Sequence, residues 1–444
     1  MTFDELNLNK PLLRALTDLG YTTPTPIQQN VFSVVLSGRD VCGIAQTGTG
    51  KTLAYLLPCL RLFQFAKDKQ PQQPQVLILV PTRELVVQVT ETIGQLTRYM
   101  NVATVGVYGG VNLKTHVAEV QAGADVLVAT PGRLTDLLLS GAVRMKHLKR
   151  LVIDEVDELL NLGFRAQLTT ILDLLPPKRQ NLLFSATLTD EVEQLILTYF
   201  NNPVRIEAAP AGTPLTNIQQ SAYWVPNFYT KVNLLRLLLR RDAGMTKVLL
   251  FTATKALADQ IFNLLTDDLS GQIGVIHGNK SQNGRFDAVE RFEAGTYRVL
   301  IGTDIVARGI DVADVSHVVN FDLPEEPEAY VHRIGRTGRA DKTGVAIAFV
   351  TEAEGDRRAA IEALMQYVIP TRHLPDDLVI SDELTDDERP TVRMKAIDLT
   401  PARDEVGLAF HEKSAKNQKV NVRRDHLAEK RLKYGRPIKR SGKK

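Results

Sequence analysis

Short apolar runs alternate with helical patterns along most of this chain, and the alternation occurs twice. Strands that are continuous apolar runs separated by helices are typical of parallel sheets covered on both faces. The pattern therefore predicts an α/β chain with two parallel-sheet domains. The first series of runs, between residues 40 and 208, is DVCGIA, VLILVP, ATVGVYG, VLVAT, RLVIDE, NLLFSAT and VRIEA, and the second is VLLFT, IGVIHG, RVLIGT, HVVNFD and GVAIAFV.

The two halves also resemble each other in sequence. VLILVPTRELVVQV (76–89) aligns with VLLFTATKALADQI (248–261), and VLVAT (126–130) aligns with VLIGT (299–303), at offsets of 172 and 173 residues. A nearly constant offset favours a duplicated domain over chance similarity between hydrophobic runs. The second copy has no Gly-Lys-Thr loop, so we expect only one nucleotide site.

The runs and the charge pattern predict five segments. These are a first domain (1–207), a linker (208–217), a second domain (218–370), an acidic-to-mixed tether (371–412) and a basic tail (413–444). The tail holds 13 Lys and Arg against two Asp and Glu, a local charge of +11, so the rest of the chain sums to −8. We expect it to be flexible and to serve either solubility or non-specific phosphate binding.

The composition is that of a globular protein, with 44% apolar and 24% charged residues among 444. These values exclude a largely disordered, collagenous or coiled-coil chain. The polar, acidic start and the lack of long apolar stretches predict a cytoplasmic protein without a membrane partner. Cys42 and Cys59 are expected to be buried thiols, since two cysteines support neither a disulfide framework nor a zinc site.

A glycine-rich loop, AQTGTGKT from Ala45 to Thr52, stands between the run DVCGI and the helical pattern LAYLLPCL. There, Gly48 and Gly50 let backbone N–H groups approach phosphate oxygens, Lys51 supplies a charge for the β- and γ-phosphates, and Thr52 reaches Mg²⁺. The strict pattern has Gly where Ala45 stands. The alternative is a glycine-rich turn with an incidental lysine.

LVIDEVD places Asp154 and Glu155 at the end of an apolar run, where unpaired carboxylates are costly to desolvate. Asp154 is expected to hold Mg²⁺ through water, and Glu155 to orient or deprotonate the attacking water. The alternative is a helix N-cap. Because AQTGTGKT, PTREL, TPGR, DEVD and SAT all begin where a predicted strand ends, they should line one edge of one sheet, where ligands bind.

HRIGRTGR (332–339) carries Arg336 and Arg339, three residues apart, with no acidic residue in the motif. On a helical turn the two would share a face. We expect them to reach the γ-phosphate across a cleft between the domains as arginine fingers. The alternative is an exposed basic face.

Taken together, the motifs resemble those of the DEAD-box family of ATP-dependent RNA helicases, from Phe3 to about Val368. The resemblance implies two tandem RecA-like domains that close on ATP and Mg²⁺, with RNA-stimulated ATP hydrolysis. The motifs stand in family order: Phe3, GYTTPTPIQ ending at Gln28, AQTGTGKT, PTREL, Gly109-Gly110, TPGR, DEVD, SAT, HGNKSQNGR, TDIVARGID and HRIGRTGR.

The resemblance also assigns roles to single positions. Phe3 would stack on adenine, Gln28 would pair with its edge and Asp311 would hold the ribose, while Asp157 would bond to Ser185 and Thr187 and couple the nucleotide to RNA. The implied ATP-binding positions are Phe3, Gln28, Ala45, Gln46, Thr47, Gly48, Thr49, Gly50, Lys51, Thr52 and Asp311. The implied RNA-binding positions are Thr82, Arg83, Gly110, Thr130, Arg133, His277, Gly278, Arg285 and Thr303.

Most of the RNA positions belong to motifs that contact the sugar-phosphate backbone, so binding should be largely independent of sequence. The expected activity is local separation of RNA duplexes, with RNA and RNA-processing or ribonucleoprotein components as partners. Two alternatives are an ATP-gated RNA clamp or assembly scaffold and a DNA translocase. Val156 replaces the Ala of the family's name-giving motif and adds a branched side chain next to Asp157.

Overall fold

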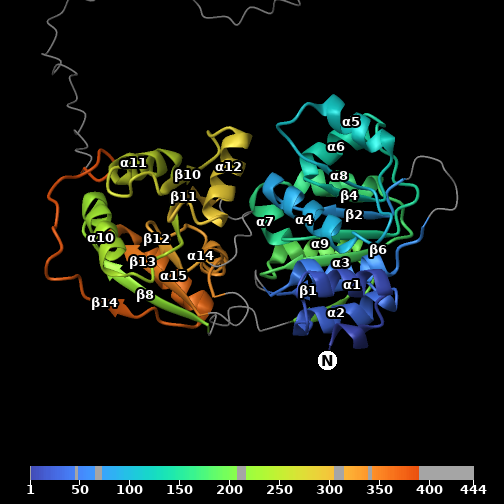
Figure 1. Cartoon of the computed structure of the whole chain (residues 1–444), viewed down its shortest axis with the longest axis horizontal. Helices are drawn as coiled ribbons and strands as arrows, with labels where there is room; N and C mark the ends of the chain where they lie inside the picture. Colours follow the sequence, from blue (N-terminus) through green and yellow to red (C-terminus); the bar gives the residue numbers. More distant parts are fainter. Residues whose placement is uncertain are drawn as a thin grey trace, which may run out of the picture. The chain divides into compact units, whose positions relative to one another are not determined.

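The computed structural model describes residues 2–45, 49–65, 73–207, 217–304, 315–338 and 343–389. Residues up to Arg389 form one compact unit, which contains two seven-stranded sheets (Figure 1). All the strand pairs recorded in both sheets are parallel. The α/β class with two parallel sheets is therefore confirmed.

The first sheet has the strand order β3-β4-β2-β5-β6-β1-β7. Its strands are β1 (Val41–Ile44), β2 (Val76–Leu79), β3 (Thr104–Val107), β4 (Val126–Ala129), β5 (Arg150–Ile153), β6 (Gln180–Ser185) and β7 (Val204–Glu207). Its helices are the 3₁₀ helix η1 (Phe3–Leu6), α1 (Lys10–Asp18), α2 (Pro26–Leu36), α3 (Lys51–Arg61), α4 (Arg83–Leu96), α5 (Leu113–Ala122), α6 (Pro131–Leu139), α7 (Val156–Asn161), α8 (Arg165–Leu174) and α9 (Asp190–Tyr199).

The second sheet has the order β10-β11-β9-β12-β13-β8-β14. Its strands are β8 (Ile218–Trp224), β9 (Val248–Thr252), β10 (Ile273–Ile276), β11 (Val299–Thr303), β12 (His317–Asn320), β13 (Gly344–Val350) and β14 (Thr371–Arg372). Its helices are α10 (Phe228–Arg241), α11 (Lys255–Leu265), α12 (Gln282–Glu293), α14 (Pro327–Ile334), the 3₁₀ helix η2 (Glu352–Glu354) and α15 (Gly355–Met365).

The two sheets share one topology, as a duplicated domain requires. β2 lies between β4 and β5 in the first sheet, and β9 lies between β11 and β12 in the second. The registers also agree, because Val76 pairs with Val126 and Val248 pairs with Val299. These are the strands whose sequences align at offsets of 172 and 173 residues.

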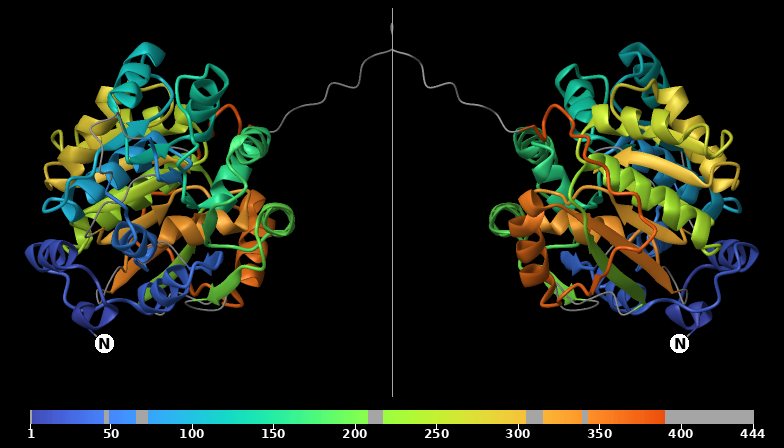
Figure 2. Two further views of the ribbon diagram at one scale, coloured as in Figure 1. Left: turned by 90° about the vertical axis from the view of Figure 1, so that its right-hand side faces the viewer. Right: turned by 90° about the vertical axis from the view of Figure 1, so that its left-hand side faces the viewer.

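Helices cover both faces of the first sheet (Figure 2). Along β2, Val76 and Ile78 enter one hydrophobic core while Leu77 and Leu79 enter the other, because successive side chains of a strand point to opposite faces. A strand buried on both faces must be apolar throughout, which explains the continuous runs in the sequence. Cys42 and Cys59 are buried free thiols, as expected.

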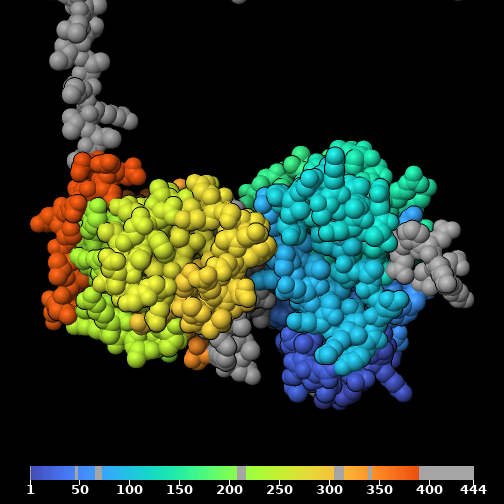
Figure 3. Space-filling view, turned by 45° about the horizontal axis from the view of Figure 1, so that its top comes forward, coloured from blue at the N-terminus to red at the C-terminus, as the bar shows by residue number. Residues whose placement is uncertain are grey.

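The described part of the predicted tether packs against the second sheet. Thr371–Arg372 form β14 beside β8. Beyond it, the chain, coloured red-orange, lies along the yellow-green atoms of the second half (Figure 3). On α10, Asn233 Nδ2 donates to the Val379 carbonyl oxygen at 2.9 Å, and the Phe228 N–H donates to Glu388 at 2.7 Å. The other segment limits stay predictions, because the linker up to residue 216 and the chain from 390 lie outside the described residues. No described helix is both long and apolar enough to span a bilayer.

Candidate nucleotide and RNA site

The five motifs expected at one sheet edge lie there. They follow β1, β2, β4, β5 and β6, all parallel strands of the first sheet, so their first residues meet at its carboxyl-terminal edge. Loops at this edge of an open α/β sheet form its usual ligand site.

The glycine-rich loop has the strand-loop-helix context that the sequence predicts. Gly50 has φ +88° and ends the loop, and α3 begins at Lys51. The Lys51 side chain is only 6% exposed, and its Nζ has no hydrogen-bond partner among the described residues. A buried ammonium that makes no hydrogen bond can still donate to a bound anion, and the N-terminus of α3 adds its own preference for a phosphate.

The remaining loop positions are described in part. Thr49 accepts a hydrogen bond from the Thr25 hydroxyl at its carbonyl oxygen, at 2.9 Å. Ala45 is buried at the end of β1, and Thr52 lies in the first turn of α3. The predicted positions Gln46, Thr47, Gly48 and Asp311 lie outside the described residues.

Two buried carboxylates lie near Lys51. Burial raises the pKa of Asp154, and the charge of Lys51 opposes that rise. Burial also raises the pKa of Glu155, to about 7, against the attraction of Arg336 and Lys51. Glu155 stands at the N-cap of α7 with φ +49°, but its side chain makes no capping hydrogen bond. Capping therefore does not account for this carboxylate, whose strained backbone is typical of functional sites.

Arg336 comes from the second sheet's half of the unit, and its guanidinium is the cation that lowers the pKa of Glu155 most. With 4% exposure it is buried, so the exposed-face alternative is wrong for this residue. The helical premise is also wrong, because α14 ends at Ile334 and Arg336 lies in the turn after Gly335. Arg339 lies outside the described residues.

Asp157 forms the expected contact with the SAT motif. Its Oδ2 accepts from the Thr187 N–H and hydroxyl, each at 2.9 Å. Ser185 bonds differently from the expectation, because its hydroxyl donates to the Thr187 carbonyl oxygen at 2.6 Å. The Ser185–Thr187 bond is internal to the SAT loop, whereas the bonds from Thr187 to Asp157 attach the loop to α7.

His332 contacts Asp157 and Glu158, and these contacts were not predicted from the sequence. Its Nδ1 lies 2.5 Å from Glu158 Oε1 and its Nε2 lies 3.7 Å from Asp157 Oδ2. Burial alone would lower the pKa of His332, but the bond to Glu158 and the charge of Asp157 raise it. Three buried charged groups thus join α14 to α7. Two sequence features could have indicated this contact: His332 opens HRIGRTGR, and Glu158 adds a carboxylate directly after DEVD.

The predicted adenine contacts are both buried. Phe3 is 4% exposed within a hydrophobic core, and Gln28 is 4% exposed. The Gln28 Oε1 accepts from the Thr25 N–H at 2.9 Å, and its Nε2 donates to the Gly50 carbonyl oxygen at 3.2 Å. Because an amide has two lone pairs and two N–H donors, each end keeps one position for another partner. Gln28 also ties α2 to the glycine-rich loop.

A pocket of about 580 Å³ is lined by loop residues and by residues of α4, α6 and α12, so both sheets' halves contribute to it. Six of the nine predicted RNA positions line it: Thr82, Arg83, Thr130, Arg133, Gly278 and Arg285. Thr82 and Thr130 are the N-cap residues of α4 and α6. Helix N-termini and arginines are suited to phosphates, so this pocket can hold a nucleic-acid backbone.

The other three predicted RNA positions do not line this pocket. Gly110 has φ +85° and lies against the Arg83 side chain. His277 is 1% exposed and its Nε2 lies 3.0 Å from Asp259, while Thr303 ends β11.

Glu84 was not assigned from the sequence, although it stands inside PTREL. Its carboxylate forms an ion pair with Arg285 at 3.2 Å and accepts a bond from Gln282 Nε2 at 3.1 Å. These contacts join α4 to α12 at the pocket. The carboxylate also fixes the Arg285 guanidinium in place.

His116 on α5 is a further residue that the sequence did not reveal. Arg133 Nη1 lies 2.6 Å from His116 Nδ1, and Arg133 Nη2 donates to the Val111 carbonyl oxygen at 2.7 Å. A guanidinium can only donate, so His116 accepts through Nδ1. Burial and the charge of Arg133 lower the pKa of His116, which favours this neutral form.

Removing this acceptor is expected to weaken RNA binding by about tenfold. His116→Leu leaves the guanidinium of Arg133 short of a partner, at a cost of about 1–3 kcal/mol, whereas His116→Gln can restore an acceptor. RNA titration measures the effect, ATP affinity should not change, and the exposed His147→Leu serves as control. Equal RNA affinities for His116→Leu and wild type would remove His116 from this role.

Comparison with known proteins places this geometry in a family. The model "DEAD/DEAH box helicase" matches residues 25–195, and "Helicase conserved C-terminal domain" matches residues 230–341. The ATP-dependent RNA helicase DbpA of Bacillus subtilis (strain 168) is 40% identical over 373 residues, covering 84% of this chain and 76% of that protein. The DEAD-box ATP-dependent RNA helicase CshA of Geobacillus kaustophilus (strain HTA426) is 38% identical over 354 residues, covering 80% and 74%.

Solved structures agree with these matches. S. cerevisiae Dbp5 bound to RNA and ADP BeF3 is similar with a TM-score of 0.75 and 29% identity, covering 84% of this chain and 96% of that one. Mss116p bound to ssRNA and AMP-PNP gives a TM-score of 0.76 and 27% identity, covering 84% and 80%.

Proposed function

Because the chain belongs to the DEAD-box family of ATP-dependent RNA helicases, with two tandem RecA-like domains, we propose that it separates short RNA duplexes locally by hydrolysing ATP. One observation carries the assignment of the catalytic groups. Burial raises the pKa of Glu155, and the charges of Arg336 from the second domain and Lys51 from the first both oppose that rise. These three groups thus meet around the place that the γ-phosphate would take.

The residues divide the work as follows. Lys51 and the N-terminus of α3 bind the phosphates, and Glu155 takes the proton of the attacking water. Arg336 stabilises the charge that develops on the transferred phosphoryl group. Asp157 and His332 transmit the state of the site, since they join α7 to both the SAT loop and α14.

Mg²⁺ fits this site because burial raises the pKa of Asp154, and a nearby cation would stabilise its ionised carboxylate. Asp154, through water, and the Thr52 hydroxyl would hold it. When bound, the ion would neutralise charge on the β- and γ-phosphates.

RNA would bind in the pocket lined by Thr82, Thr130, Arg133 and Arg285. These groups contact phosphates and sugars, which supports binding without base readout. Closure of the two domains would bend one strand away from duplex geometry, and hydrolysis would reset the clamp. We place the protein in the cytoplasm, with other RNA-processing or ribonucleoprotein components as further partners.

A fluorescent duplex with a short stem tests this function. The full chain with ATP and Mg²⁺ is expected to release the labelled strand, and ATP turnover should rise with RNA but not with DNA. RNA-stimulated turnover without strand release would favour the ATP-gated clamp or assembly scaffold. Equal stimulation by DNA would favour a translocase.

A further inference from the structure

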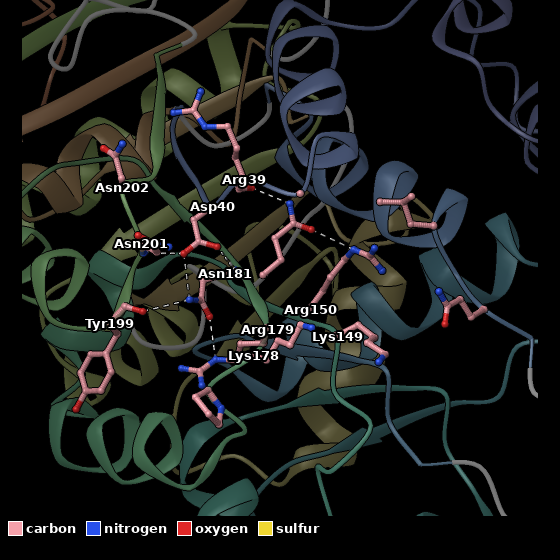
Figure 4. A pocket seen from close by; sticks show the side chains of 15 residues that line it. Arg39, Asp40, Lys149, Arg150, Lys178, Arg179, Asn181, Tyr199, Asn201 and Asn202 are labelled. Carbon is pink, nitrogen blue, oxygen red and sulfur yellow. Dashed lines mark hydrogen bonds between the residues drawn. The ribbon is translucent and has the colours of Figure 1, made fainter.

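A cavity of about 870 Å³ opens at the amino-terminal edge of the first sheet, opposite the edge that carries the nucleotide motifs. Arg39 precedes β1, Lys149 and Arg150 lie where β5 begins, and Lys178 and Arg179 precede β6. Because β5 and β6 are four and six residues long, the two edges lie roughly 13 to 20 Å apart. We call the cavity with these five cations the amino-edge groove (Figure 4).

The groove is strongly positive although the charges of residues 1–412 sum to a negative value. Its lining holds five Lys and Arg side chains and one carboxylate, Asp40, while residues 1–412 sum to −8. Asp40 is 6% exposed, and its oxygens accept from the N–H groups of Asn181 and Asn201 at 2.8 and 2.9 Å. The Asp40 carboxylate is therefore bonded to backbone N–H groups, and the five cations leave the groove with an excess of positive charge.

The two half-buried arginines of the groove are held by neutral acceptors. Arg150 Nε donates to Gln180 Oε1 at 3.2 Å. Arg179 Nε donates to Asn181 Oδ1 at 2.9 Å, and its Nη1 donates to the Pro176 carbonyl oxygen at 2.9 Å. Within the described ranges, neither arginine forms an ion pair with a carboxylate. Because neutral acceptors orient these guanidinium groups without neutralising them, the groups can bind an external anion.

The rim adds three exposed positive charges. Arg39, Lys149 and Lys178 are exposed, and Figure 4 shows them spread around Asp40 and Asn181. The amide side chains of Asn201 and Asn202 also line the groove. A lining dominated by cations and amides is typical of nucleic-acid backbone contacts, whereas protein partners usually need buried aromatic or aliphatic anchors.

We propose that the amino-edge groove is a second binding site for the phosphate backbone of RNA, separate from the pocket at the opposite edge. It would hold an arm of a structured RNA beyond the segment that is bound for strand separation. This inference rests on the proposed function, since it assumes that the same RNA occupies the pocket lined by Thr82, Thr130, Arg133 and Arg285. The protein should therefore prefer RNAs that have a structured flanking arm, whatever the base sequence of that arm.

The test replaces the three exposed cations in the full chain, as Arg39→Gln, Lys149→Gln and Lys178→Gln. The control replaces three exposed cations outside the groove, as Lys10→Gln, Arg98→Gln and Lys146→Gln, with the same change of charge. Binding is measured over a range of salt for a single strand of about ten nucleotides and for the same strand attached to a duplex arm.

For the groove variant we expect about tenfold weaker binding of the armed RNA and unchanged binding of the short strand. The log-log salt dependence for armed RNA should become shallower by about 2 to 3, because three phosphate contacts are lost. Equal losses of armed-RNA binding in the groove and control variants, or no loss in the groove variant, would overturn the proposed second site. If the wild-type protein bound neither RNA, the proposed function itself would fail.

Discussion

Glu155→Gln is expected to lower ATP turnover by about 10²- to 10⁴-fold, the usual contribution of a general base. Glutamine has nearly the same shape but cannot accept the proton of the attacking water. Burial sets the pKa of Glu155 to about 7, which suits a base acting near neutral pH. The amide also removes a negative charge beside the phosphate site, so ATP affinity should not decrease.

Single-turnover kinetics with RNA present measure the chemical step directly, and titrations with a non-hydrolysable ATP analogue measure binding. Glu119→Gln on the exposed face of α5 is the matched control and should behave as wild type. Turnover of Glu155→Gln within about twofold of wild type would mean that another group activates the water. Loss of nucleotide or RNA binding would instead point to a role in ground-state binding.

Much of the fold follows from the sequence because its parallel strands are buried on both faces. Such strands must be continuous apolar runs, as Leu77 to Leu79 illustrate. β8 was missed because its sequence, IQQSAYW, is not such a run: polar residues interrupt it. Gln220 is nevertheless buried, because Tyr330 donates its hydroxyl to Gln220 Oε1 at 3.1 Å. A buried polar group with a distant partner cannot be recognised from local periodicity.

The candidate site divides in a similar way. Residues of the strand-end motifs, such as Lys51 and Asp154, could be placed because parallel topology collects strand ends at one edge. His116 could not be placed, because its importance lies in one bond to Arg133 from another helix. The turn at Arg336 was also missed, since three-residue spacing alone does not reveal that a helix ends at Ile334.

Arg336→Gln is expected to reduce kcat for ATP by about 10³-fold or more, the range found for arginine fingers elsewhere. The guanidinium comes from the second domain to the carboxylate of Glu155 in the first, so it can act only when the two domains meet. Arg336→Lys should recover little activity, because an ammonium lacks the planar, bidentate geometry.

The division between kcat and binding makes this prediction specific. A group that acts mainly on the transition state lowers kcat while the affinity for ATP stays within a few-fold of wild type. Arg240→Gln, whose side chain is 70% exposed on α10, controls for the loss of one positive charge. If Arg336→Gln raised KM and left kcat unchanged, the arginine would serve substrate binding alone, and the charge on the transferred group would be stabilised by the first domain without help from the second.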